Sequence, residues 1–430
     1  MKKKLGKYFL CFLGITSLLL IISRYYTPMS INKPNFYYFF IPLILFIFVI
    51  FYDKFPKKVS SGITFIFFNV IFFFYSVEFF YQINLGNFEK KQKVFFDKNN
   101  LDSRKIKEMY EEEIKNSNKN TIFFPPQYHL NKNLKIFPLS GISKKNTIMC
   151  NESGFYNSYI SDRHGFNNDD KIYDKEKIPI VFIGDSFLHG ACVNNNQNLI
   201  YKLKNRPFFK DKEIYNLGYS GNGVLLSYAT LREYFPENKS VKHIFWLYYE
   251  GNDLLELKKE FSNPILKRYI KNKNFSQKLT FKQSKINSFL QTEIKKGFMT
   301  KNEDNKGKKI ISFLSLDKVR KKIFKLFKKE YLLNQEIITN FSKVISNAKK
   351  FAVNNNAVIT FIYLPHRYEK NEGRFYYKNV INILNKNNIK VIDLTKDDFY
   401  KKSENYPKYG AHFNRKGYEQ LALKISDYFN

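Results

Sequence analysis

Hydrophobic positions change their pattern along the chain, and each pattern predicts a different part of the molecule. The first fifth holds three long apolar runs, at residues 8–23, 36–52 and 63–81. Each run approaches the ~20 residues that a helix needs to cross the hydrocarbon core of a bilayer. We therefore expect a membrane anchor over residues 1–83, with about three transmembrane helices. A charged segment with one helical pattern follows, and residues 84–175 are predicted to be a linker and lead-in.

Lysines around the apolar runs predict the orientation of this anchor. Four precede the first run and three separate the second from the third, whereas the loop between the first and second holds only Arg24 and Lys33. Because positive loops stay in the cytoplasm, everything after Tyr81 is predicted to lie outside the bacterial cytoplasmic membrane. The first run could be a cleaved signal peptide, but no small-x-small site follows it, so an anchor is favoured. Glu78, in the third run, is expected to reach the interface.

From residue 178 onward, short β-branched runs alternate with helical periodicity. The expected strands are residues 178–183, 213–217, 243–249, 358–364 and 390–394, and the expected helices are 199–203, 224–234, 337–353, 380–384 and 417–429. Strands that alternate with helices predict an α/β fold with a mainly parallel, doubly wound sheet. This domain should span residues 176–430, with a lysine-rich insertion at about 258–330 that is a candidate cap or docking surface.

The net charge and the number of cysteines limit the classes of binding partner and the disulfides that we expect. The formal net charge is +34, which would suit nucleic acid or an anionic surface, but the lysines are spread along the chain. We therefore favour a basic face beside membrane or anionic glycan over nucleic-acid binding. Three cysteines exclude a disulfide scaffold, although Cys150 and Cys192 could pair in an oxidising compartment. Neither metal-ligand spacing nor a dinucleotide fingerprint is evident, so no metal or cofactor is expected.

Chemistry-bearing residues follow three successive predicted strands. Ser186 comes after Gly184-Asp185, Gly221 lies in the glycine-rich turn at 216–223, and Asn252 stands in Glu250-Gly251-Asn252-Asp253. His412 precedes the last predicted helix. Open parallel sheets place ligand sites at the carboxyl ends of their strands. A hydroxyl, amide donors and an imidazole at one edge supply a nucleophile, an oxyanion site and a base for acyl transfer.

This ordered set resembles the SGNH (GDSL) hydrolase family over residues 178–430. The resemblance implies a flavodoxin-like three-layer α/β/α fold and esterase, lipase or O-acyltransferase chemistry. It assigns Ser186 as nucleophile, His412 as base, and Gly221 and Asn252 as oxyanion donors. Asp185 should fix the serine turn. Gly251 and Asp253 are the other supporting residues. Residues 161–168 resemble the lead-in of membrane-anchored members from bacterial surface-polysaccharide gene clusters. His164, His189 and His366 are interpreted as surface or packed histidines.

One position departs from the family pattern. Family members usually carry an aspartate three residues before the histidine, where this chain has Tyr409. Such a carboxylate orients the imidazole and stabilises the imidazolium. Three interpretations stay open: a Ser–His dyad, a replacement acid such as Asp397, Asp398 or Glu404, or a weak or inactive site.

The sequence thus predicts a membrane-anchored esterase or O-acyltransferase, acting on an acylated cell-envelope polysaccharide or lipid-linked sugar. The favoured acyl group is acetyl, and a transferase would need a separate multi-span membrane partner as acyl donor. The alternative is an inactive SGNH-fold protein that binds glycan or serves as a scaffold, because fold alone does not fix function.

Overall fold

The computed structural model describes residues 2–26, 40–299, 310, 312–314, 316–320, 322, 335–368 and 373–429. The chain divides into two compact units. The helical unit comprises Met1–Lys91 and Asn302–Glu330, and the α/β unit comprises Gln92–Lys301 and Tyr331–Asn430.

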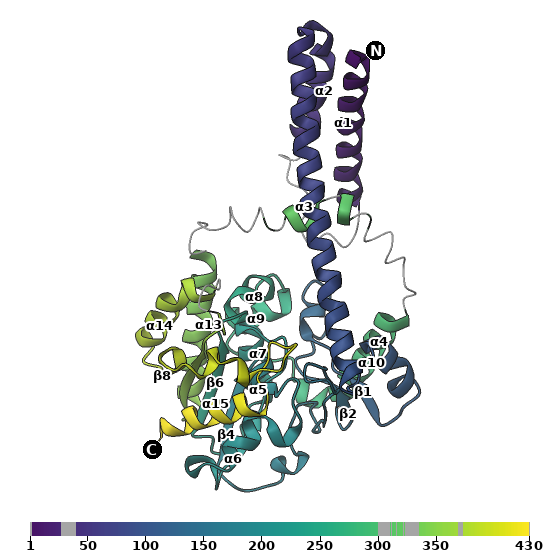
Figure 1. The fold of residues 1–430 in the computed structure, drawn as a ribbon. Helices are drawn as coiled ribbons and strands as arrows, with labels where there is room; N and C mark the ends of the chain where they lie inside the picture. The colour runs from purple at the N-terminus through teal and green to yellow at the C-terminus, as the bar shows by residue number, and fades with distance from the viewer. Residues whose placement is uncertain are drawn as a thin grey trace. The chain divides into compact units, whose positions relative to one another are not determined.

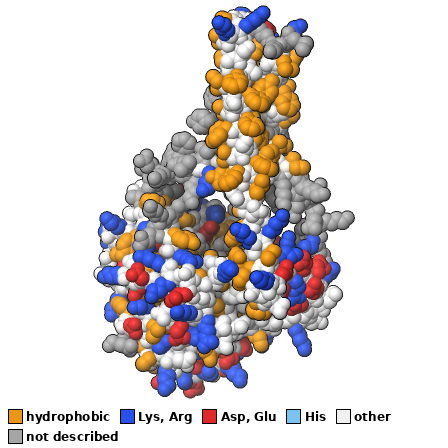
Figure 2. All heavy atoms as spheres, in the orientation of Figure 1, with side chains coloured by type: hydrophobic (Ala, Val, Ile, Leu, Met, Phe, Trp, Pro, Cys, Tyr) orange, Lys and Arg blue, Asp and Glu red, His pale blue; other side chains and the backbone are white. Residues whose placement is uncertain are grey.

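Apolar helices form the first part of the helical unit. They are α1 (Lys2–Tyr26), α2 (Phe40–Phe51) and α3 (Lys57–Lys98), whose last residues extend into the α/β unit. Among the described residues, α3 alone is long and apolar enough to cross a membrane. Apolar side chains are exposed along the apolar helices in Figure 2. On α3 the exposed side chains include Phe65, Phe72 and Phe73. The other two predicted spans coincide with α1 and α2, but α2 has only 12 described residues, so the three-span arrangement stays a prediction.

Glu78 of α3 is buried against a segment of the predicted insertion. Its carboxylate accepts hydrogen bonds from the backbone N–H groups of Lys318 (2.9 Å) and Val319 (2.8 Å). The Tyr75 hydroxyl donates to the carbonyl of Leu314 at 2.8 Å. The Glu78 carboxylate therefore binds the insertion backbone, a role that differs from the expected reach toward the interface.

Five parallel strands form the sheet of the α/β unit (Figure 1). They are β4 (Pro179–Gly184), β5 (Glu213–Asn216), β6 (His243–Tyr249), β7 (Val358–Leu364) and β8 (Lys390–Asp393). Their order is β5-β4-β6-β7-β8, and every neighbouring pair is parallel. The predicted parallel α/β sheet is confirmed, and this order is the flavodoxin-like one in which the chain reverses direction beside the first strand.

Helices cover both faces of this sheet because both faces are apolar. Along β4, Val181 and Ile183 point into one core cluster, and Ile180 and Phe182 point into the other. The first cluster includes side chains of α7 (Val224–Tyr234), α8 (Asp253–Glu260), α9 (Pro264–Lys271), α10 (Gln283–Met299), α13 (Gln335–Asn354) and α14 (Tyr377–Lys386). The second includes side chains of α5 (Ser186–His189), α6 (Leu199–Lys204) and α15 (Arg415–Asp427).

The segment before the sheet also packs into the α/β unit. It contains α4 (Ile106–Met109) and a small sheet of β1 (Asn120–Ile122), β2 (Asn146–Ile148) and β3 (Ser158–Ile160). Met109, Tyr110 and Ile114, which carry the helical pattern in the sequence, are buried in the first core cluster. Residues of the predicted linker and lead-in thus contribute directly to the hydrophobic core.

Candidate active site

Ser186 begins the short helix α5 directly after β4. Gly184 permits this because a Cβ there would lie 2.5 Å from the carbonyl oxygen of Leu247 on the neighbouring strand β6. Asp185 caps α5 by accepting the backbone N–H of Phe187 at 2.9 Å, and its other oxygen lies 3.2 Å from Ser186 Oγ. Burial raises the pKa of Asp185 to about 6. Asp185 therefore fixes the turn that presents the Ser186 hydroxyl, as the sequence predicts.

The loops after β5 and β6 flank Ser186 because these strands are the two neighbours of β4. Gly221 lies in the first loop with φ +91°, a conformation that favours glycine. Asn252 immediately precedes α8 in the second. Within the described part of the chain, neither the Gly221 N–H nor the Asn252 side-chain amide donates a hydrogen bond. Both remain available to an oxyanion.

Gly251 and Asp253 shape the second loop. A Cβ at Gly251 would lie 2.4 Å from the Tyr249 ring and 2.9 Å from the His366 ring, so a side chain there would displace these rings. Buried Asp253 accepts the backbone N–H of Tyr249 at 2.9 Å. These contacts hold the backbone on both sides of Asn252, which is a supporting role.

His189 supports the glycine-rich turn. Its Nδ1 accepts the backbone N–H of Ser220 at 3.1 Å, and its ring stacks on Tyr219. Burial lowers the pKa of His189 to about 3, so the ring is neutral and can accept this bond. Burial likewise lowers the pKa of His164 to about 4. His366 Nδ1 accepts the N–H of Tyr368. All three histidines have local structural contacts.

His412 bridges Ser186 and a carboxylate. Its Nε2 lies 2.9 Å from Ser186 Oγ, and its Nδ1 lies 2.8 Å from Glu152 Oε1. An ionised carboxylate can only accept, so the proton sits on Nδ1 and the Nε2 lone pair faces the serine hydroxyl. This is the tautomer that a general base needs.

Glu152 is the acid of this chain of hydrogen bonds, and it lies in the loop between β2 and β3. Its second oxygen, Oε2, accepts the backbone N–H groups of Ala411 and His412 at 3.0 Å each. One carboxylate therefore holds both the imidazole and the backbone that carries it. The side chains of Glu152 and His412 are 19% and 23% exposed, so the pair is largely shielded from water.

The acids suggested by the sequence are elsewhere. Asp397 pairs with Lys424 at 2.7 Å, Asp398 pairs with Lys401 at 3.0 Å, and Glu404 pairs with Lys416 at 2.9 Å. These three candidates were wrong, because their carboxylates are bound to lysines and the position beside Nδ1 is taken by Glu152.

Tyr409 has a different role from the aspartate usually found at its position. Its ring packs against Phe95 and Phe96 at the end of α3, with ring centroids 5.2 and 6.0 Å away. The loop that carries His412 is thus attached to the last turn of α3 through aromatic contacts.

The electrostatics of the His412–Glu152 pair favour its charged form. Burial alone lowers the pKa of His412, but the hydrogen bond to Glu152 and the charges of Glu152 and Asp185 raise it above its usual value overall. Burial raises the pKa of Glu152, but its bonds to His412 lower it overall. The site therefore stabilises an imidazolium next to a carboxylate, which is the state that forms when a base takes the serine proton.

A disulfide between Cys150 and Cys192 lies beside this pair. Glu152, Cys192 and His412 offer potential ligand atoms within 4.8 Å of one another. Metal sites use the cysteine thiolate, and a sulfur in a disulfide has no thiolate to offer. The arrangement is thus suited to proton transfer in the oxidised protein.

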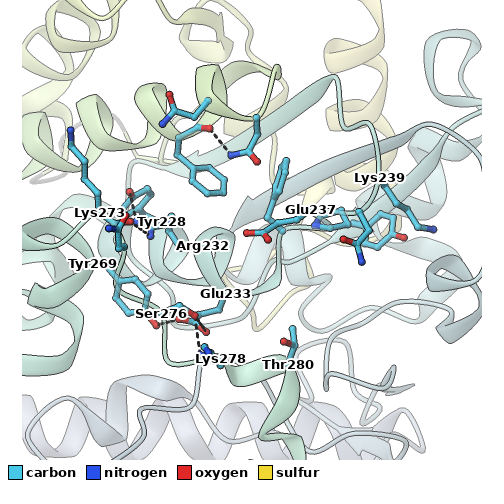
Figure 3. A pocket seen from close by; sticks show the side chains of 18 of the residues that line it. Tyr228, Arg232, Glu233, Glu237, Lys239, Tyr269, Lys273, Ser276, Lys278 and Thr280 are labelled. Atoms are coloured by element: carbon cyan, nitrogen blue, oxygen red, sulfur yellow. Dashed lines mark hydrogen bonds between the residues drawn. The ribbon is translucent and has the colours of Figure 1, made fainter.

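A cavity of about 840 Å³ lies away from these residues, beside the C-terminal end of α7. It is lined by Arg232, Glu233, Lys239 and Lys278 among others (Figure 3). Glu233 accepts hydrogen bonds from the Tyr269 hydroxyl and from two backbone N–H groups after α9. This carboxylate joins α7 to the insertion, and the cavity contains none of the predicted site residues.

Glu152 is the residue that the sequence reasoning missed. Its signal was the cysteine pair: Glu152 follows Cys150 by two residues, and Cys192 follows Ser186 by six. A disulfide between them would have placed an acid near the nucleophile, but the spacing of two cysteines does not establish a bond.

No family model and no curated protein matches the chain. Solved structures with a distant likeness include a lipolytic G-D-S-L family protein from Veillonella parvula (14% identity, 59% of this chain and 98% of that one, TM-score 0.32). Others are the lipase Lip_vut3 from a goat rumen metagenome (15% identity, 58% and 96%, TM-score 0.31) and the acetylxylan esterase Axe2 from Geobacillus stearothermophilus (11% identity, 58% and 92%, TM-score 0.31).

Strand order and site residues together define the class of the fold. The sheet order is flavodoxin-like, and Ser186, Gly221 and Asn252 follow three adjacent strands while His412 precedes the last helix. The α/β unit therefore has an SGNH/GDSL hydrolase-like fold.

Proposed function

We propose that this chain is a membrane-anchored serine esterase or O-acyltransferase of the SGNH type. The observation that carries the proposal is the hydrogen-bonded series Ser186–His412–Glu152, with distances of 2.9 and 2.8 Å. A nucleophile, a base and an orienting acid within hydrogen-bond reach are the signature of covalent acyl transfer.

The mechanism follows from the atoms in place. Ser186 Oγ attacks the ester carbonyl while His412 Nε2 takes its proton, and Glu152 stabilises the imidazolium through Nδ1–H. The tetrahedral oxyanion receives hydrogen bonds from the N–H groups of Ser186 and Gly221 and from the Asn252 amide. As the intermediate collapses, His412 returns the proton to the departing alcohol oxygen. Water or a sugar hydroxyl then attacks the acyl-enzyme, and its proton passes through His412 to restore Ser186.

A site outside the cytoplasmic membrane would have a cell-envelope glycan or glycolipid within reach, so we propose this class of substrate, with acetyl as the favoured acyl group. Helix α3 is apolar and long enough to span a bilayer, and disulfides persist chiefly in oxidising compartments outside the cytoplasm. Both observations support a site outside the cytoplasmic membrane. A transferase in this position needs acyl groups exported to it, so we propose a multi-span membrane protein as acyl donor in that case.

Hydrolysis of p-nitrophenyl acetate by the full chain in detergent tests the proposal. Ser186→Ala should remove turnover and labelling by a fluorophosphonate probe, whereas Ser288→Ala, a serine exposed on α10, should remove neither. Equal rates for wild type and Ser186→Ala would remove Ser186 from the mechanism. Neither turnover nor labelling in the wild type would favour the non-catalytic glycan-binding protein. Release of acetate from acetylated glycan, or its transfer to a glycan acceptor, separates esterase from transferase.

A further inference from the structure

We infer that the Cys150–Cys192 disulfide positions Glu152 against His412, so that the proposed active site is complete only in the oxidised chain. The inference rests on the proposed function and adds a condition for it. Cys150 and Cys192 would be positioning residues, because Cys192 contacts Nδ1 of His412 and the nucleophile Ser186 contacts Nε2.

The disulfide lies next to both partners of the His412–Glu152 hydrogen bond, since atoms of Glu152, Cys192 and His412 lie within 4.8 Å of one another. Cys150 is two residues before Glu152, so its bond fixes the loop that delivers the carboxylate. Cys192 Sγ lies 3.6 Å from His412 Nδ1, the atom that donates to Glu152. Cys192 itself is six residues after Ser186, on the loop that follows α5. One covalent bond therefore links the segments of the acid and the nucleophile next to the base.

Hydrogen bonds hold the backbone of the Glu152 loop in addition to the disulfide. The Asp102 N–H donates to the Gly154 carbonyl at 2.7 Å, and the Tyr156 hydroxyl donates to the Arg104 carbonyl at 2.9 Å. Asn157 Nδ2 donates to the carbonyl of Val193 at 3.0 Å, and the Asn151 amide donates to the carbonyl of Asp102. These bonds keep the loop near the α/β core without the disulfide. They do not fix the Glu152 side chain, which reaches the base only through its own bonds to residues 411 and 412.

Reduction would therefore loosen the acid without unfolding the domain. A carboxylate that moves by about 1 Å loses its alignment with Nδ1–H, and misplacements of that size can cost about 10²-fold in rate. A free Cys192 sulfur beside Nδ1 would also compete for the same proton. A chain still in a reducing cytoplasm would thus carry an incomplete site, and the activity would appear after export.

The acidic limb of the rate–pH profile reports on this arrangement. The charged groups that act on His412 are Glu152, from the lead-in loop, and Asp185, at the end of β4. Because Glu152 raises the pKa of His412, moving it away lowers that pKa. The base then stays neutral to lower pH, so the acidic limb shifts to lower pH while kcat falls.

The experiment compares four forms of the full chain in detergent: wild type, Cys150→Ser/Cys192→Ser, Glu152→Gln, and the combined triple variant. The double cysteine variant should lose about 10- to 100-fold in kcat with little change in KM, and its acidic limb should shift. In the Glu152→Gln background, removing the cysteines should change kcat by less than about twofold, since the groups act through one contact. Wild-type kcat in the double cysteine variant, or losses that multiply in the triple variant, would overturn the inference.

Cys11 supplies a matched control, because it is the free cysteine of the chain. Phosphine reductant should lower the activity of Cys11→Ser as it does that of wild type, and it should have no effect on Cys150→Ser/Cys192→Ser. Far-UV circular dichroism must show that the double cysteine variant stays folded; a variant that unfolds would overturn the positioning role. Loss of activity in Ser186→Ala together with an unaffected double cysteine variant would reject this inference alone. Full activity in Ser186→Ala would reject the proposed function itself.

Discussion

Glu152→Gln is the substitution that best tests the site, because it keeps the shape of the side chain and changes only what its two end atoms can do. In the wild type, Oε1 accepts from His412 Nδ1, and Oε2 accepts two backbone N–H groups. Glutamine has one oxygen and one NH₂ group, and it cannot accept on both sides.

The backbone N–H groups determine the orientation of the glutamine side-chain amide. Two fixed N–H donors at residues 411 and 412 require an acceptor, so the glutamine oxygen should face them. Its NH₂ group then points at His412 Nδ1, which must become an acceptor, and the imidazole proton moves to Nε2. A protonated Nε2 cannot take the Ser186 proton. Holding the wrong tautomer costs about 10³–10⁴-fold in kcat in serine enzymes, or about 4–5.5 kcal/mol in the barrier.

The assay is kcat and KM for p-nitrophenyl acetate over a range of pH. We expect kcat to fall by about 10³–10⁴-fold and KM to change little, since Glu152 binds His412 at Nδ1 and the nucleophile lies at Nε2. Glu404→Gln is the matched control, because Glu404 forms an exposed pair with Lys416 and should retain wild-type rates. A Glu152→Gln enzyme within threefold of wild type would refute the tautomer argument, and so would an equal loss in Glu404→Gln.

Three further variants examine the surroundings of this pair. Asn252→Ala removes a proposed oxyanion donor and should lower kcat about 10²–10³-fold, measured with the same ester. Tyr409→Ala removes the ring contacts with Phe95 and Phe96 and should lower the free energy of unfolding by about 1 kcal/mol in denaturant titrations. Glu78→Ala leaves the backbone N–H groups of residues 318 and 319 without their acceptor, and it should speed proteolytic cleavage at residues 316–320. Unchanged cleavage would contradict the binding of these residues to α3.

The sheet was predictable because its signals are local. Residues 243–249 and 358–364 are apolar, β-branched or aromatic runs bounded by polar turns, and both match their strands to the residue. Alternation with helical periodicity then predicted parallel pairing. Local sequence signals did not predict which parts of the molecule the insertion packs against. Its first part packs into the α/β core through Leu266 and Leu290, and Leu314 and Val319 contact α3. Both sets of contacts join residues that are far apart in the sequence.

The candidate site shows the same division between local and distant determinants. Ser186, Gly221 and Asn252 follow strands, so the sheet topology brings them together and a motif reveals them. The acid is not tied to the end of a strand. Its carboxylate must only reach His412 Nδ1, and any loop that passes beside this atom can supply it. Glu152 comes from 260 residues upstream, and the usual position is filled by Tyr409, which packs on α3 instead. A motif therefore predicts the nucleophile and base, whereas the acid follows from tertiary contacts, here including a disulfide that ends beside the base.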